Sequence, residues 1–178
     1  MRRIKQGSET ALQELMLHAA HVLERLAESL LYDKGLAADV VQETFISVWT
    51  HRHEYDERMP AWPWIARILR NKCHAVWRKA GGRRHDGPIR GEPLVDLAEF
   101  VPSPLSWQEQ EHEKAQLMQM ARDCILQLSP ACREVVQLFL FSDLPEREIA
   151  HLLGVPLGTV KSRKNRGLSI LRSKLGST

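Results

Sequence analysis

Apolar residues in the first half of the chain recur about every 3.6 residues, the period of an α-helix, and no β-type alternation competes with this spacing. The pattern predicts a long first helix over the apolar positions from Ala11 to Leu30, and a second helix from about Leu36 to His51. Beyond Trp64 the apolar residues repeat as a buried helix face would. We therefore expect three helices packed together in this half.

The helical spacing continues in the second half. It predicts one helix with an apolar face over residues 117–128, and another over residues 130–141 that Ser129 caps. Asp143, with Glu146 three residues later, predicts a capping box at the start of the next helix.

Two helices near the C-terminus are separated by one tight turn. The first is predicted over residues 145–153, and Gly154 ends it, because glycine readily adopts the left-handed conformation common at helix C-termini. Pro156 suits the first position of the following helix, since its φ angle is already helical. This pattern predicts a helix-turn-helix.

The second helix of this motif carries charge of one sign. No Asp or Glu occurs after Ile149. The side chains expected to point outward are Thr159, Lys161, Ser162, Arg163 and Arg166, while Leu157, Val160, Leu168, Leu171 and Leu175 can face inward. Basic charge on a recognition-type helix is typical of DNA binding. The alternative is an ordinary solvated basic helix that closes a helical bundle.

Charge along the rest of the chain falls in blocks. Residues 59–85 contain Lys and Arg but no acid, whereas residues 91–113 contain acids but no Lys or Arg and are interrupted by proline. Such acidic, proline-rich sequence buries too little apolar surface to offset its ordering entropy. We therefore predict an all-α protein of two small helical domains, residues 1–86 and 106–178, joined by a flexible acidic linker over residues 87–105.

Composition sets the broad class. Hydrophobic residues make up 43% of the 178 residues, and a net charge of +3 indicates no partner by itself. No apolar run is long enough for a signal peptide or a membrane span, which predicts a cytoplasmic protein without membrane insertion. Cys73, Cys124 and Cys132 form no CxxC pair, which fits a reducing compartment. A thiol redox switch is the alternative.

Two further surfaces could bind partners. Asp39, Gln42 and Glu43 share one helix face and suit a basic partner, although their spacing also fits a solvated face. The segment that follows mixes tryptophans with Lys and Arg, as proteins that bind single-stranded nucleic acid do. Trp64 is expected in the core, and Trp62 is the best candidate for exposure, in the loop before the helix.

No feature of the sequence indicates an enzyme. The chain lacks a phosphate-binding glycine loop, and its histidines and the Cys73-His74 pair lack the spacing of a four-ligand metal site. We expect no catalytic residue, cofactor or metal.

Three segments together resemble bacterial RNA polymerase sigma factors of the extracytoplasmic function (group 4) class, in the sigma-70 family. They are the run from Ala38 to Phe45 leading to Val48-Trp49, the run Trp64-Ile65 followed by Arg67, Ile68, Arg70, Asn71 and Arg78, and the sequence EIAHLLGVPLGTVKSR. The resemblance covers nearly the whole chain. It implies sigma region 2 in residues 1–86 and sigma region 4 in residues 106–178.

The resemblance also implies a role for each surface. Residues expected to dock on core RNA polymerase are Asp39, Gln42, Glu43, Phe45 and Trp49. Those expected to recognise and open the minus-10 promoter element are Trp62, Arg67, Arg70, Asn71, Arg78 and Lys79. Those expected to enter the major groove at the minus-35 element are Thr159, Lys161, Ser162, Arg163 and Arg166.

The partners implied are core RNA polymerase, promoter DNA and an inhibitory anti-sigma factor, which in this family is often membrane-associated. A stand-alone helix-turn-helix regulator is the alternative, but it leaves the Asp39 patch and the tryptophan-rich segment without a purpose. The chain departs from the family pattern at Pro145, where a capping Ser or Thr is common, and at Gly167, where Ala is commoner.

Overall fold

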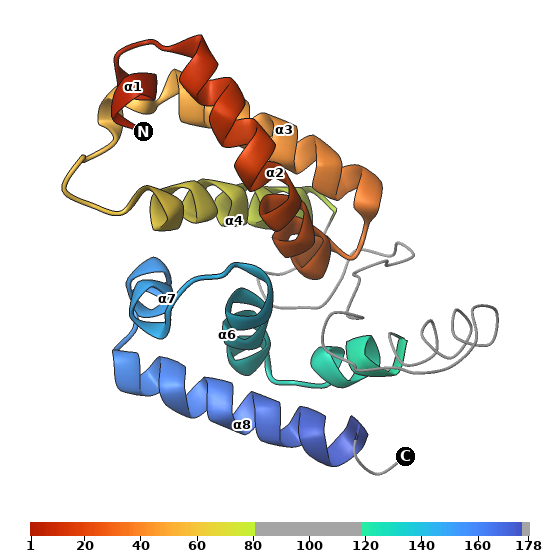
Figure 1. Ribbon diagram of the computed structural model, residues 1–178. Coiled ribbons are helices and arrows are strands. Elements are labelled where there is room, and N and C mark those ends of the chain that lie inside the picture. The colour runs from red at the N-terminus through yellow and green to blue at the C-terminus, as the bar shows by residue number, and fades with distance from the viewer. Residues whose placement is uncertain (81–118, 176–178) are drawn as a thin grey trace, which may run out of the picture.

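The computed structural model describes residues 1–80 and 119–175, and every regular element within these ranges is helical (Figure 1). The predicted linker over residues 87–105 and the domain boundaries beside it lie outside the described residues. In chain order the elements are α1 Arg2–Lys5, α2 Glu9–Leu31, α3 Lys34–Thr50, the 3₁₀ helix η1 Arg52–Glu54, α4 Ala61–Lys79, α6 Pro130–Phe141, α7 Glu146–Leu153 and α8 Leu157–Leu175. A further helical stretch covers residues 119–126. The all-α prediction is confirmed.

Polar caps set the helix boundaries in the first half. The Ser8 side chain accepts a hydrogen bond from the Ala11 amide (3.3 Å) and begins α2. The Asp33 carboxylate accepts one from the Leu36 amide (2.9 Å) and begins α3. Both caps satisfy amides that a helix start leaves without an intrahelical acceptor. Between the two helices Tyr32 adopts a left-handed conformation, with φ of 56°, which turns the chain.

The helix-turn-helix forms with a different start from the one predicted. Gly154 ends α7 in the left-handed conformation, with φ of 67°, as expected. The capping box between Asp143 and Glu146 is absent, because α7 begins at Glu146 itself and Pro145 occupies the N-cap position. Glu146 instead pairs with Lys164 of α8, which ties the two helices of the motif together. Ser129 likewise makes no side-chain cap on α6.

The helices form two lobes that lie one above the other in Figure 1. We call α1 to α4 the N-terminal lobe, and residues 119–175 the C-terminal lobe. One continuous apolar core joins them: Leu26 and Leu69 of the N-terminal lobe belong to the same buried cluster as Leu138 and Ile149 of the C-terminal lobe. Each fully buried leucine contributes about 2 kcal/mol. The lobes are therefore held together by their shared interior.

A second, smaller cluster lies inside the C-terminal lobe, between α6 and α8. Its buried members are Cys124, Ile125, Leu128, Cys132, Val136 and Leu171. α8 approaches α6 closely at Gly167, which is buried. A Cβ atom at this position would lie 2.5 Å from Val136 Cγ2. Glycine is therefore required here by packing, although it disfavours a helix.

Replacing Gly167 by alanine should lower the free energy of unfolding by about 1–2 kcal/mol, because overpacking a core costs more than the helix propensity gained. Chemical denaturation in a double-mutant cycle with Val136→Ala checks this. In the Val136→Ala background the clashing methyl group is gone, so the same change should be neutral or stabilising. Equal effects in both backgrounds would contradict the steric explanation.

Candidate protein and nucleic-acid interfaces

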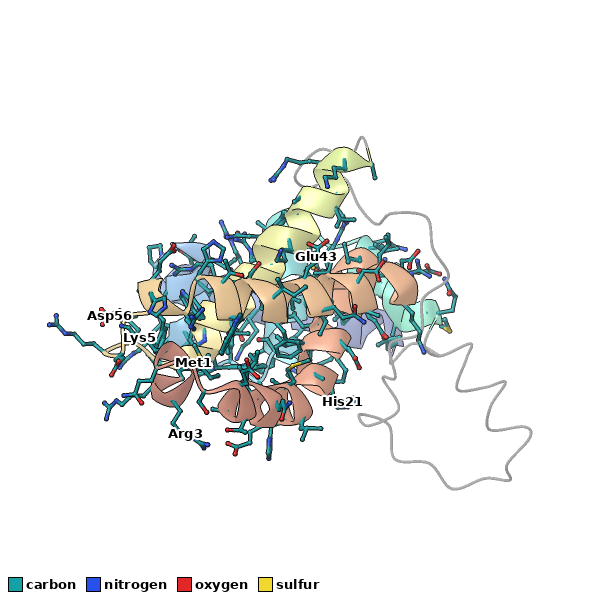
Figure 2. The ribbon with its side chains drawn as sticks, turned by 90° about the horizontal axis from the view of Figure 1, so that it is seen from above. Met1, Arg3, Lys5, His21, Glu43 and Asp56 are labelled. Atoms are coloured by element: carbon teal, nitrogen blue, oxygen red, sulfur yellow. The ribbon has the colours of Figure 1, made fainter. Side chains whose placement is uncertain are left out.

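The first candidate interface is an acidic patch on α3. Asp39, Gln42 and Glu43 are all exposed, as the sequence predicts. Glu43 pairs with Lys72 Nζ of α4 at 3.1 Å, and Figure 2 shows Glu43 near the place where α3 crosses α4. Because 63% of the Glu43 side chain remains exposed, this pair is weak and a partner's cation can compete for it.

The exposure of two apolar residues of α3 differs from what the predicted patch requires. Phe45 is only 4% exposed, so it supports the patch from the core and does not lie on it. Ile46, which is not among the predicted interface residues, is 65% exposed. It follows Asp39, Gln42 and Glu43 at helical spacing, and that spacing is the signal that could have found it. Trp49 is half-buried, with the Arg52 guanidinium 4.4 Å above its ring.

The second candidate interface is the tryptophan-rich helix α4. The structure corrects the prediction for Trp62, which lies in the first turn of α4 and is half-buried. Its Nε1 donates a hydrogen bond to the Ser142 carbonyl at 2.7 Å. No local pattern could reveal this contact, because Ser142 follows α6 in the other lobe. Trp64 is also half-buried, and its ring packs against Tyr55 with 5.3 Å between centroids.

Two arginines of α4 are held by the C-terminal lobe as well. Arg67 Nη2 donates to the His151 carbonyl at 3.3 Å and lies 3.2 Å from His151 Nδ1. Arg70 Nε and Nη2 lie 2.8 and 2.7 Å from Glu134 Oε1 of α6. The remaining residues predicted to bind the minus-10 element are exposed, and they are Asn71, Arg78 and Lys79. The predicted DNA surface is thus partly covered.

Glu134 is the anion at the centre of this contact. Its Oε1 also lies 3.3 Å from His74 Nε2, and the side chains of Glu134 and Arg70 are only 16% and 15% exposed. Burial alone would raise the pKa of Glu134, but hydrogen bonds from His74 and Arg70 and the charge of the guanidinium outweigh it. Together they lower the pKa from 4.5 to about 2. Glu134 is therefore ionised at neutral pH.

A buried amide adds a second polar link between the lobes. Gln137 of α6 is 4% exposed and donates to the Ser29 carbonyl and to the Tyr32 hydroxyl, the latter at 2.9 Å. Burial raises the pKa of Tyr32 to about 12, so its hydroxyl keeps its proton. Since buried polar groups are costly without partners, these bonds favour one alignment of the two lobes.

The third candidate interface is the outer face of α8. Lys161, Ser162 and Arg166 are exposed, and Thr159 and Arg163 are half-buried. The helix contains no acid. Val160 and Leu171, which anchor it, are buried as predicted. α8 lies on the side of the C-terminal lobe away from the N-terminal lobe (Figure 1). Its basic surface is therefore open while part of α4 is covered.

The cysteines lie in the interior. Cys73, Cys124 and Cys132 are buried free thiols. Burial raises the pKa of Cys73 to about 12, which keeps this thiol protonated and unreactive in the structure. Across residues 1–80 and 119–175, no three His, Cys, Asp or Glu side chains gather where they could hold a metal ion. Within the same ranges, no helix is both long and apolar enough to cross a membrane.

The two helical lobes each match a known protein family. Residues 15–83 match the family model described as Sigma-70 region 2, and residues 118–171 match Sigma-70, region 4. The ECF RNA polymerase sigma factor RpoE of Cereibacter sphaeroides is 30% identical over 94% of this chain and 87% of its own length. The ECF RNA polymerase sigma factor SigL of Mycobacterium tuberculosis is 32% identical over 95% and 92%. The chain belongs to the extracytoplasmic function (ECF) class of the sigma-70 family.

Solved structures share the fold. The structure of CnrH in complex with the cytosolic domain of CnrY matches with a TM-score of 0.71 and 22% identity, covering 99% of this chain and 94% of that one. The sigma factor RpoE in complex with the anti-sigma factor NepR, from Bartonella quintana, matches with a TM-score of 0.68 and 23% identity, covering 95% and 98%. The two-lobed helical fold is therefore that of known sigma factors.

The depressed pKa of Glu134 predicts an acid-sensitive contribution to stability. Because the folded pKa of about 2 lies below the unfolded value of 4.5, the contribution is complete above about pH 4.5 and is lost as the pH falls towards 2. A shift of this size corresponds to at most about 3 kcal/mol. The stabilities of wild-type protein and Glu134→Gln, measured by denaturation, should therefore differ at pH 7, and the difference should shrink below about pH 4.5 and vanish only near pH 2. A difference that does not change with pH would contradict this role for the carboxylate.

Proposed function

We propose that this sigma factor selects promoters by binding two separate promoter elements, one with each lobe. In this proposal α4 holds the minus-10 element and α8 reads the minus-35 element, while α3 binds core RNA polymerase. The observation that carries the assignment is the separation of opposite charges: exposed basic residues lie on α8 in the C-terminal lobe, whereas the exposed acids Asp39 and Glu43 lie on α3 in the N-terminal lobe, and Figure 1 shows these two helices far apart.

The α8 surface suits duplex DNA. Lys161 and Arg166 can contact phosphates, which position the helix without reading sequence, while Thr159 and Ser162 offer hydroxyl groups to base edges. Each good base contact is worth about 1–3 kcal/mol, so one short helix selects a promoter poorly by itself. Attachment to polymerase supplies the rest by raising the effective concentration of both lobes at the promoter.

The α4 surface suits a separated strand. Trp62 offers a ring on which a base can stack, and Arg67, Arg70, Arg78 and Lys79 offer charges to phosphates. The linker between the predicted domains, residues 1–86 and 106–178, would set the distance between the two promoter elements.

Regulation in this proposal comes from an anti-sigma factor, in many family members membrane-associated, that occupies the surfaces used for polymerase and DNA. The two structural neighbours were solved in complexes, CnrH with the cytosolic domain of CnrY and RpoE with the anti-sigma factor NepR, and this supports a partner of this kind. The chain would itself catalyse no reaction, use no cofactor and act in the cytoplasm.

Run-off transcription with purified core polymerase on fragments of the host genome tests the proposal. We expect discrete transcripts that depend on this chain. A chain that bound specific duplex DNA tightly in gel shifts but directed no initiation would instead be a stand-alone regulator.

The polymerase-binding role of α3 can be tested by charge reversal at Asp39. Asp39→Arg should weaken binding to core polymerase by roughly tenfold or more, because it sets like charges against each other in the contact. Fluorescence anisotropy with labelled core polymerase measures the change. Glu24→Arg, at an exposed acid on the adjacent helix α2, is the matched control and should bind as wild type does. Equal losses in both variants would exclude a specific role for the Asp39 patch.

A further inference from the structure

The docking of the two lobes has a consequence for DNA binding. α6 and α7 lie directly beneath α4 in Figure 1, and they meet it with polar groups as well as with the apolar core. Three of the residues proposed to bind the minus-10 strand are engaged by groups of the C-terminal lobe, and they are Trp62, Arg67 and Arg70. A DNA strand cannot use the same donors while these contacts persist.

The chemistry of the contact imitates that of DNA. Glu134 presents an ionised oxygen to two nitrogens of the Arg70 guanidinium, as a phosphate would. The Ser142 and His151 carbonyls supply acceptors to Trp62 and Arg67. The acceptors in place are therefore of the kind that a nucleic-acid strand would bring.

The covering is one-sided. Lys161 and Arg166 are exposed on α8, and Figure 1 shows α8 on the side of the C-terminal lobe away from the N-terminal lobe, so they remain open to duplex DNA. The chain in this arrangement can thus use one promoter-binding surface and not the other.

We infer that the chain has a closed state in which its own C-terminal lobe competes with single-stranded DNA for α4, with Glu134 in the place of a backbone phosphate. The inference rests on the proposed role of α4 in minus-10 binding. Opening must separate the buried Arg70–Glu134 pair, and DNA or polymerase must supply the binding free energy for it. The apparent affinity for single-stranded DNA is then reduced by the fraction of molecules that are closed.

The test uses the full chain and its Glu134→Gln variant. Fluorescence anisotropy measures binding to a labelled single-stranded DNA of mixed sequence, about 20 nucleotides long, and to a duplex of the same length. Small-angle X-ray scattering of the free chain measures its radius of gyration. Glu134→Gln should bind the single strand roughly tenfold more tightly and have a larger radius of gyration, with duplex affinity changed by less than about twofold.

Glu54→Gln is the matched control, because it removes the same charge at an exposed site in η1 of the N-terminal lobe. It should leave the radius of gyration and both affinities as in the wild type. If both variants gain the same affinity, the effect is one of net charge, and the inference is overturned. Unchanged or weaker single-strand binding by a folded Glu134→Gln chain overturns it as well.

Two further outcomes are decisive. If Glu134→Gln does not fold, as judged by circular dichroism, His151→Ala replaces it, since His151 is exposed and the change removes the ring Nδ1 that lies 3.2 Å from Arg67 Nη2 while it keeps the carbonyl contact; a gain in single-strand affinity supports the closed state, and no gain opposes it. If neither wild type nor variants bind the single strand, the role of α4 itself fails. If the chain directs run-off transcription but its variants show no gain in single-strand affinity, only the closed state is overturned, and the proposed function stands.

Discussion

The arrangement of this sigma factor depends on burial of apolar surface between two lobes that are far apart in the sequence. Leu26 and Leu69 on one side and Leu138 and Ile149 on the other belong to one core, so separating the lobes exposes side chains that neither lobe covers alone. Such burial is strong but not directional. Direction comes from polar contacts between the lobes, above all from the buried Gln137 amide and from the Arg70–Glu134 pair.

Two contacts between the lobes, Arg70–Glu134 and Trp62–Ser142, use side chains whose chemistry also suits nucleic acid. An arginine that can hold a phosphate can equally hold a carboxylate, and an indole N–H that can meet a base can also meet a backbone carbonyl. In the proposed function, cohesion of the folded chain and recognition of a DNA strand would therefore draw on the same donors. α8 has no such conflict, because its packing uses buried Val160 and Leu171 while its basic side chains face outward.

Several features were predictable because their causes are local. Helical periodicity, the left-handed turn at Gly154, the exposed face of Asp39, Gln42 and Glu43, and the one-signed charge of α8 all follow from neighbouring residues in the chain. The predicted capping box at Asp143 was wrong, because Pro145 is the N-cap and α7 begins at Glu146. Local residue preferences do not decide reliably between two possible helix starts only one or two residues apart.

The sequence by itself thus determined the helices, their buried and exposed faces, and the family. Only the tertiary structure decided that Trp62 meets Ser142, that Glu134 neutralises Arg70, and that Gly167 must stay small beside Val136. The physical reason is the distance along the chain over which each effect acts. Periodicity and capping act over a few residues, whereas each of these outcomes depends on a surface brought into contact from another helix, and pattern along the chain does not encode which surface that is.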